Sequence, residues 1–253
     1  MRISIVQHNI DKGDRQATLH EVERLLVGAS PSDLYVLPEM FATGFVMDAP
    51  AIAEAEGGVT LCWMKAAAKR LGGAVVGSVA VASGESYVNR LYFVKPDGYV
   101  AYYDKRHLFT YGGEPQNYVP GRSRVVVEYG GVRFLLQVCY DLRFPVWSRN
   151  TGDYDVAIYV ASWPKSRIAV WDLLLKARAV ENQCFVVGVN RVGDDGVSQY
   201  TGNSVITDYY GRPMAACEPG EASVATCDID LAKLSEFRRK FPVLDDADSF
   251  TLT

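Results

Sequence analysis

Histidine and paired cysteine are scarce in this sequence of 253 residues, which has three His and five Cys but no Cys-x-x-Cys pair. Metal centres need several such ligands at close, regular spacing, so we expect no metal ion. The glycine pairs match neither a dinucleotide fingerprint nor a phosphate-binding loop, so we expect no cofactor either. An odd number of widely spaced cysteines indicates a reducing compartment, and we expect the cytoplasm.

An excess of positive charge is lacking as well. Lys and Arg number 26 against 30 Asp and Glu, a formal net charge of -4 at pH 7, and the densest basic run is only residues 238–240. This balance argues against a nucleic-acid partner. No uninterrupted apolar run approaches the ~20 residues of a membrane-spanning helix. The N-terminus enters an expected strand without an apolar signal stretch, so we expect no membrane partner.

The residues that are present predict an α/β fold. Segments of helical period, set between short β-branched runs, include residues 60–71, 167–181 and 231–240. Turn signals at 96–98 and 130–131 predict two β-hairpins. Buried strands interleaved with helices indicate mixed sheets whose outer faces are covered by helices. Because no linker or repeat interrupts the pattern, we predict a single domain over residues 1–253, with a C-terminal tail from about residue 241.

Three chemically reactive side chains each follow an expected strand: Glu39, Lys105 and Cys139. Reacting groups collect at the carboxyl ends of strands in α/β sheets, so we expect these three to lie together. A thiolate is a strong nucleophile, a neighbouring ammonium favours it, and a carboxylate can accept its proton. Taken singly, each residue also fits a structural role. Glu39 fits a helix cap or an ion-pair partner, Lys105 a solvated strand end, and Cys139 a buried thiol.

Three segments carry a family resemblance. Residues 37–41, 104–109 and 139–145 resemble the Glu, Lys and Cys motifs of the nitrilase superfamily in order and approximate spacing. Residues 237–242, followed by 246–248, are most similar to bacterial omega-amidases. The resemblance implies a four-layer α-β-β-α sandwich in a single domain, usually paired into a homodimer. It also implies hydrolysis of carbon–nitrogen bonds through a cysteine thioester, without a cofactor.

The resemblance further implies a role for each residue of the site. Cys139 is expected to be the nucleophile and Glu39 the group that accepts and returns its proton. Lys105 and the backbone N–H of Tyr140 are expected to stabilise the oxyanion of the tetrahedral intermediate. Glu114 resembles the family's second glutamate, which positions either the substrate or the lysine.

Similarity to omega-amidases implies a small-molecule amide as substrate, 2-oxoglutaramate or 2-oxosuccinamate, and the release of ammonia. Such substrates carry a carboxylate, and Arg143 is the candidate to bind it because it lies four positions after Cys139. An ion pair of Arg143 with Asp141 or with a glutamate is an equally good interpretation. His8 and His107 flank expected strand ends, where each fits a pocket-lining or a structural hydrogen-bonding role.

Two kinds of alternative are compatible with these motifs. Other amidases, carbamoylases and nitrilases share all three motifs. The pocket loops that would distinguish these enzymes are difficult to predict from the sequence. A binding protein that has kept the fold and lost the chemistry is the second alternative. The intact Glu39, Lys105 and Cys139 argue against it, because loss of at least one would be expected.

Overall fold

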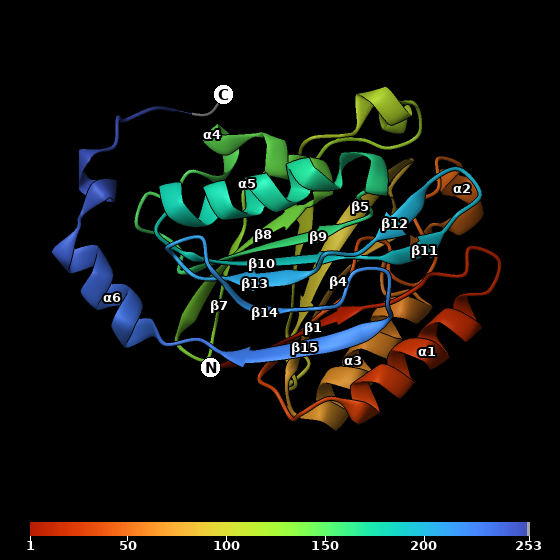
Figure 1. The fold of residues 1–253 in the computed structure, drawn as a ribbon. Coiled ribbons are helices and arrows are strands. Elements are labelled where there is room, and N and C mark those ends of the chain that lie inside the picture. The colour runs from red at the N-terminus through yellow and green to blue at the C-terminus, as the bar shows by residue number, and fades with distance from the viewer. Residues whose placement is uncertain (252–253) are drawn as a thin grey trace.

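Two β-sheets pack face to face between helices in the computed structural model, which describes residues 1–251 (Figure 1). In spatial order the first sheet contains β15 (Ser223–Asp228), β1 (Arg2–Gln7), β2 (Leu34–Val36), β4 (Ala74–Ser83), β5 (Ser86–Val94) and β6 (Val100–Asp104), and β3 (Glu54–Ala55) pairs with β4. Strands β1, β2 and β4 are parallel. Because β5 is antiparallel to both β4 and β6, β6 runs in the same direction as β2.

The second sheet is also mixed. Its strands in spatial order are β14 (Pro213–Ala216), β13 (Val205–Thr207), β10 (Phe185–Asn190), β9 (Val156–Ala161), β8 (Val132–Val138) and β7 (Val126–Tyr129). Its central strands β8, β9 and β10 are parallel. A separate two-stranded ribbon consists of β11 (Val192–Asp194) and β12 (Gln199–Thr201).

Helices cover both outer faces, with α1 and α3 on the first sheet and α4 and α5 on the second (Figure 1). The α-helices are α1 (Arg15–Gly28), α2 (Ala49–Ile52), α3 (Val59–Leu71), α4 (Pro145–Ser148), α5 (Ile168–Glu181) and α6 (Leu231–Lys240). The 3₁₀-helices are η1 (Thr110–Gly112), η2 (Glu114–Gln116), η3 (Cys139–Arg143), η4 (Lys165–Arg167) and η5 (Val243–Asp246). Helix α1 begins where the Asp14 carboxylate accepts the Ala17 N–H at 2.9 Å, and α3 ends at Gly72, whose φ of 66° suits glycine.

Both sheets are apolar on both faces because each sheet packs against the other sheet on one face and against helices on the other. In β1, Ile3 and Ile5 belong to the cluster between the sheets, whereas Val6 packs with the residues of α1 and α3. In β2, Leu34 and Val36 face the other sheet in the same way, because alternate side chains of a strand point to opposite faces. This packing makes four layers, α-β-β-α, as the family resemblance implied.

The expected hairpins form between β5 and β6 and between β7 and β8. The segments of helical period become α3, α5 and α6, within two residues of the expected bounds. The short elements α2, β3, β11 and β12 were not expected, because two- to four-residue elements carry too few residues to show a period. Within residues 1–251 the helices are all too short or too polar to cross a membrane. The extent of the single domain and its tail stays a prediction, and residues 252–253 lie outside the described residues.

Candidate active site

The carboxyl ends of three strands meet at one edge of the sandwich. Glu39 lies three residues after β2, Lys105 directly follows β6, and Cys139 directly follows β8. The Lys105 ammonium lies 3.0 Å from a Glu39 carboxylate oxygen, although 66 residues separate them in the chain. Both groups act electrostatically on the Cys139 thiol. The structure therefore brings together the three side chains that the sequence singled out.

Glu39 is held in one orientation by donors from three other segments. Its Oε1 accepts hydrogen bonds from Asn89 Nδ2 at 2.8 Å and from Lys105 Nζ at 3.0 Å. Its Oε2 accepts the backbone N–H of Ser162, which follows β9, at 2.9 Å. The residue is only 1% exposed. A buried carboxylate satisfied in this way keeps its position, which a group that moves a proton requires.

Lys105 lies between two carboxylates. Its Nζ donates to Glu39 at 3.0 Å and to both oxygens of Glu114, at 2.9 and 3.1 Å. Burial opposes the ammonium charge, but the carboxylates of Glu114 and Glu39 outweigh burial and raise the pKa of Lys105. The lysine is therefore a permanent cation at neutral pH.

Glu114 begins η2 and is fully buried. Its Oε2 also accepts the backbone N–H of Phe109 at 2.5 Å, so both the lysine and the loop after it are tied to this carboxylate. Burial raises the pKa of Glu114, the Lys105 ammonium counteracts this, and Glu39 adds to the rise. Glu114 thus contacts the lysine, and its part in the reaction stays a prediction.

Cys139 is placed at a strained turn. It is the first residue of η3 and has a φ of 46°, and Met40, directly after Glu39, has a φ of 45°. Such conformations cost about 1–3 kcal/mol in residues with a side chain and persist only where the surroundings enforce them. The turn leaves the Cys139 residue partly exposed at the surface of the site.

Burial raises the pKa of the Cys139 thiol well above its ordinary value. The Glu39 carboxylate adds to this rise, whereas the Lys105 ammonium and the Ser162 N–H counteract it. The free protein consequently holds a neutral thiol beside a carboxylate that can take its proton. The arrangement can generate a thiolate at the moment when a substrate carbonyl is attacked.

A small hollow opens beside Cys139. The side chains around it include Cys139, Tyr140, Arg143, Arg167, Phe109 and Trp163. A larger hollow, between α5 and β14, shares no lining residue with it. The smaller hollow is therefore the candidate substrate site, because it alone of the two contains the reactive thiol.

Arg143 lines this hollow and does not pair with Asp141. Its guanidinium lies over the Trp163 ring, 5.0 Å from the centroid. Within residues 1–251 it makes no ion pair, and the same holds for Arg167, which lies 5.3 Å from the Phe109 centroid. The predicted ion pair with Asp141 or a glutamate is therefore absent from the described residues, and two cations face the hollow.

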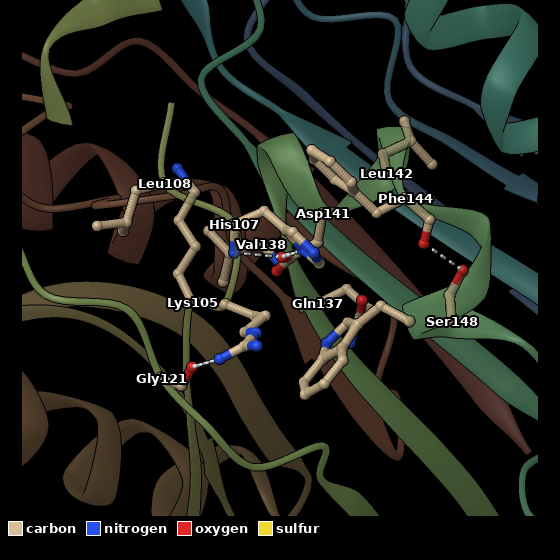
Figure 2. A network of polar contacts seen from close by, with 12 residues as sticks. Lys105, His107, Leu108, Gly121, Gln137, Val138, Asp141, Leu142, Phe144 and Ser148 are labelled. Atoms are coloured by element: carbon tan, nitrogen blue, oxygen red, sulfur yellow. Dashed lines mark hydrogen bonds and ion pairs between the residues drawn. The ribbon is translucent and has the colours of Figure 1, made fainter. Parts of the chain in front are cut away.

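The two histidines differ in their surroundings. His8 is fully buried, with its Nδ1 2.7 Å from the Asn9 carbonyl, and burial lowers its pKa to about 4. It is a neutral residue outside the lining of the hollow. His107 contacts Asp141 through Nδ1 at 2.8 Å and stacks on Phe144 at 3.8 Å between centroids (Figure 2). Both therefore make structural hydrogen bonds.

Several residues of the site escaped the sequence analysis. Asn89 lies inside β5, and nothing in its neighbourhood marks it as a partner of Glu39. The Ser162 N–H was missed because a backbone donor has no sequence signal. Arg167 could have been found as a cation shortly after the segment Ser162–Pro164 that follows a buried strand. In the part of the chain that the structure describes, no group of three or more His, Cys, Asp or Glu could hold a metal ion.

A thiol, a carboxylate and a buried ammonium at the strand ends of an α-β-β-α sandwich define a class of hydrolases that attack carbon–nitrogen bonds. The family model described as carbon-nitrogen hydrolase matches residues 2–239. The chain belongs to the carbon-nitrogen hydrolase family, which confirms the resemblance to the nitrilase superfamily. It is an enzyme of this type.

The chain is similar to several proteins over nearly its whole length. Omega-amidase YafV of Yersinia enterocolitica is 46% identical over 100% of this chain and 98% of its own length. The 2-oxoglutaramate amidase of Bacillus subtilis is 35% identical over 96% of each chain. The crystal structure of a CN-hydrolase superfamily protein from Xanthomonas campestris, with an arsenic adduct in its active site, superimposes with a TM-score of 0.97. That protein is 43% identical to this chain, and the superposition covers 99% of that protein and 100% of this chain.

Proposed function

We propose that this enzyme hydrolyses the omega-amide of small 2-oxo dicarboxylic acid monoamides, such as 2-oxoglutaramate or 2-oxosuccinamate, and releases ammonia. The observation that carries the proposal is the buried contact of Lys105 with Glu39 and Glu114, where both Lys105 and Glu39 act on the Cys139 thiol. The omega-amidase and 2-oxoglutaramate amidase among the similar proteins support the choice of substrate.

In the first half of the proposed reaction, the Cys139 sulfur attacks the amide carbon while its proton passes to Glu39. A new carbon–sulfur bond forms, and the carbonyl oxygen becomes an oxyanion. Lys105 and the backbone N–H of Tyr140 stabilise this oxyanion. The raised thiol pKa supports the assignment, because the nucleophile then needs a base at the moment of attack.

In the second half, the carbon–nitrogen bond breaks, and protonated Glu39 returns its proton to the departing ammonia. A thioester on Cys139 remains. Water then attacks the thioester carbon with Glu39 again as the base, and the acid product leaves as the thiol is restored. No step requires a metal ion or a cofactor. Glu114 acts through Lys105, because both of its oxygens accept hydrogen bonds from the ammonium.

The substrate carboxylate is assigned to the two arginines of the hollow. Arg143 and Arg167 both line it beside Cys139 and make no ion pair within the described part of the chain. A guanidinium binds a carboxylate through two parallel hydrogen bonds, and an unpaired one facing a small hollow is suited to that task. An omega-amide with a free 1-carboxylate can then place its carboxylate near the arginines and its amide near the thiol.

This assignment predicts a strong preference for the free acid. We expect kcat/KM for 2-oxoglutaramate to exceed that for its 1-methyl ester by on the order of 10²-fold or more, because the ester leaves the cations unpaired. Glutamine, which carries an ammonium in place of the 2-oxo group, should be the poorer substrate. The measurement is ammonia release with the acid, the ester, glutamine and a short uncharged amide.

Arg143→Met should reduce the preference for the acid while sparing activity on the uncharged amide. Lys165→Met is the control, because Lys165 is an exposed cation of η4 that does not line the hollow. Equal rates on acid and ester, with glutamine as good as its 2-oxo analogue, would refute the omega-amidase assignment. That result would leave an amidase, carbamoylase or nitrilase acting on another small substrate.

The proposal includes a homodimer. Large apolar side chains are exposed on α5 and α4, where Leu173, Val180 and Val146 are 65%, 51% and 55% exposed. We expect twice the chain mass of 27.9 kDa in light scattering coupled to size exclusion. Leu173→Glu together with Val180→Glu should shift the protein toward the monomer, because two charges would be buried in the interface. Val27→Glu, on exposed α1, is the control, and a monomeric wild type contradicts the proposal.

The proposal places the enzyme in the cytoplasm. All five cysteines are free in the structure, and Cys62 is exposed. Free thiols persist in a compartment that keeps cysteine reduced, whereas secreted proteins form disulfides. Full activity while all five thiols stay titratable, and loss of activity as thiols are lost under oxidising conditions, would support this placement.

A further inference from the structure

Asp141 is fully buried, and its two side-chain oxygens make four hydrogen bonds. Its Oδ2 accepts the Tyr103 hydroxyl at 2.8 Å and the Val138 backbone N–H at 2.9 Å. Its Oδ1 accepts the backbone N–H of His107 at 3.0 Å and lies 2.8 Å from His107 Nδ1 (Figure 2). All of these donors come from just two segments of the chain.

One of these segments carries the lysine of the site, and the other carries the thiol. Tyr103 and His107 stand two residues before and two residues after Lys105, so Asp141 holds the lysine segment on both sides. Val138 is the residue directly before Cys139. Asp141 itself lies in η3, the turn that Cys139 begins. One carboxylate therefore joins the end of β6 in the first sheet to the end of β8 in the second.

The hydrogen-bond inventory requires an acceptor at both carboxyl oxygens of Asp141. The Tyr103 oxygen already accepts Trp147 Nε1 at 3.1 Å and the Arg106 N–H at 3.1 Å, so its own proton has to go to Asp141. The backbone N–H groups of Val138 and His107 can only donate. A carboxylate supplies acceptors for all of them, whereas an amide would turn an NH₂ group toward these donors.

We infer that Asp141 is a positioning residue that sets the separation between the Lys105 ammonium and the Cys139 thiol. The inference rests on the proposed function, in which these two groups act on the same carbonyl. Cys139 has a φ of 46°, a conformation that has to be enforced by its surroundings, and the bond from Val138 N–H to Asp141 acts on the adjoining residue. Glu39 and Glu114 hold the lysine tip, but neither fixes the turn that carries the thiol.

The test is Asp141→Asn in the full chain. We expect kcat to fall on the order of 10²-fold with a much smaller change in KM, because misplacement of reacting groups by about 1 Å has an effect of this size. The Lys105 ammonium lowers the pKa of the Cys139 thiol, so a displaced lysine should move the pH midpoint of alkylation by iodoacetamide upward. Mass spectrometry identifies the alkylated cysteine.

Asp155→Asn is the matched control. Asp155 is another buried aspartate, bonded to Arg133 and Arg238, and it precedes β9 at the opposite end from Ser162. We expect this variant to lower the thermal stability while leaving kcat and the alkylation midpoint unchanged. Tyr103→Phe is a milder second variant that removes one of the four bonds. It should change kcat and the midpoint in the same direction as Asp141→Asn, by a smaller amount, and it decides the question if Asp141→Asn does not fold.

A wild-type kcat and alkylation midpoint in Asp141→Asn would overturn the inference, as would an effect on stability alone. For Tyr103→Phe the same two results would overturn it. Failure of the proposed function is a separate outcome, recognised by activity that survives Cys139→Ala. If Cys139→Ala is inactive and the Asp141 variant behaves like Asp155→Asn, only the positioning role of Asp141 is refuted.

Discussion

Replacing Cys139 by alanine is expected to lower kcat by on the order of 10⁴-fold or more, with the fold intact, because no other group can form the thioester. The thermal midpoint should change little, since alanine occupies the same strained backbone conformation as cysteine. Ammonia release with 2-oxoglutaramate measures the activity, and thermal unfolding monitored by circular dichroism measures the stability.

Cys62→Ala is the matched control for this variant, because Cys62 is an exposed thiol on α3 and far in sequence from the strand ends. We expect wild-type activity from it. Alkylation of the wild-type protein should abolish turnover in step with labelling of Cys139. Loss of activity on labelling of another cysteine, with Cys139 unmodified, would show that the nucleophile has been assigned to the wrong residue.

Glu39→Gln is expected to lower kcat by on the order of 10³-fold, because glutamine has the shape of glutamate but cannot accept the thiol proton. The amide oxygen can still accept from Lys105 and Asn89. Its NH₂ group would then face the Ser162 N–H, which loses its acceptor at a cost of about 1–3 kcal/mol. Mass spectrometry of the enzyme mixed with substrate should find no thioester.

Glu54→Gln is the control for this effect. Glu54 is another buried carboxylate, which accepts the Thr60 N–H at 2.8 Å and pairs with Arg15, but it does not line the hollow. We expect that variant to be less stable and equally active. Accumulation of a thioester in Glu39→Gln would mean that Glu39 serves mainly the hydrolysis of the thioester, and full activity would remove it from the reaction.

The positions of Glu39, Lys105 and Cys139 could be predicted because the end of a strand is a local feature. Each follows a run of apolar or β-branched residues, and parallel strands bring their carboxyl ends to one edge. Their catalytic roles stay predictions until the variants are measured. Glu114 was found only by resemblance, since a loop residue nine positions after Lys105 has no pattern that reveals its contact with the lysine.

The partner of Arg143 could not be predicted from its sequence neighbours. From the sequence, an ion pair of Arg143 with Asp141 was as good an interpretation as binding of the substrate carboxylate, since the two residues lie in one short turn. In the structure the oxygens of Asp141 are taken by donors that include Tyr103 and His107, more than thirty residues earlier in the chain. The guanidinium consequently lies over Trp163 and faces the hollow. Which partner a charged side chain takes depends on competing donors that only the packed sheets bring near.

The sequence by itself determined the α/β class, the two hairpins, the longer helices and the three reactive side chains at strand ends, because periodicity and turn residues act over a few neighbouring positions. The tertiary structure decided how these pieces meet: Asn89 and the Ser162 N–H orient Glu39, and Asp141 joins the lysine segment to the thiol turn. Such contacts connect strands of two sheets, and a hydrogen bond between residues far apart in the chain leaves no periodic mark on either one.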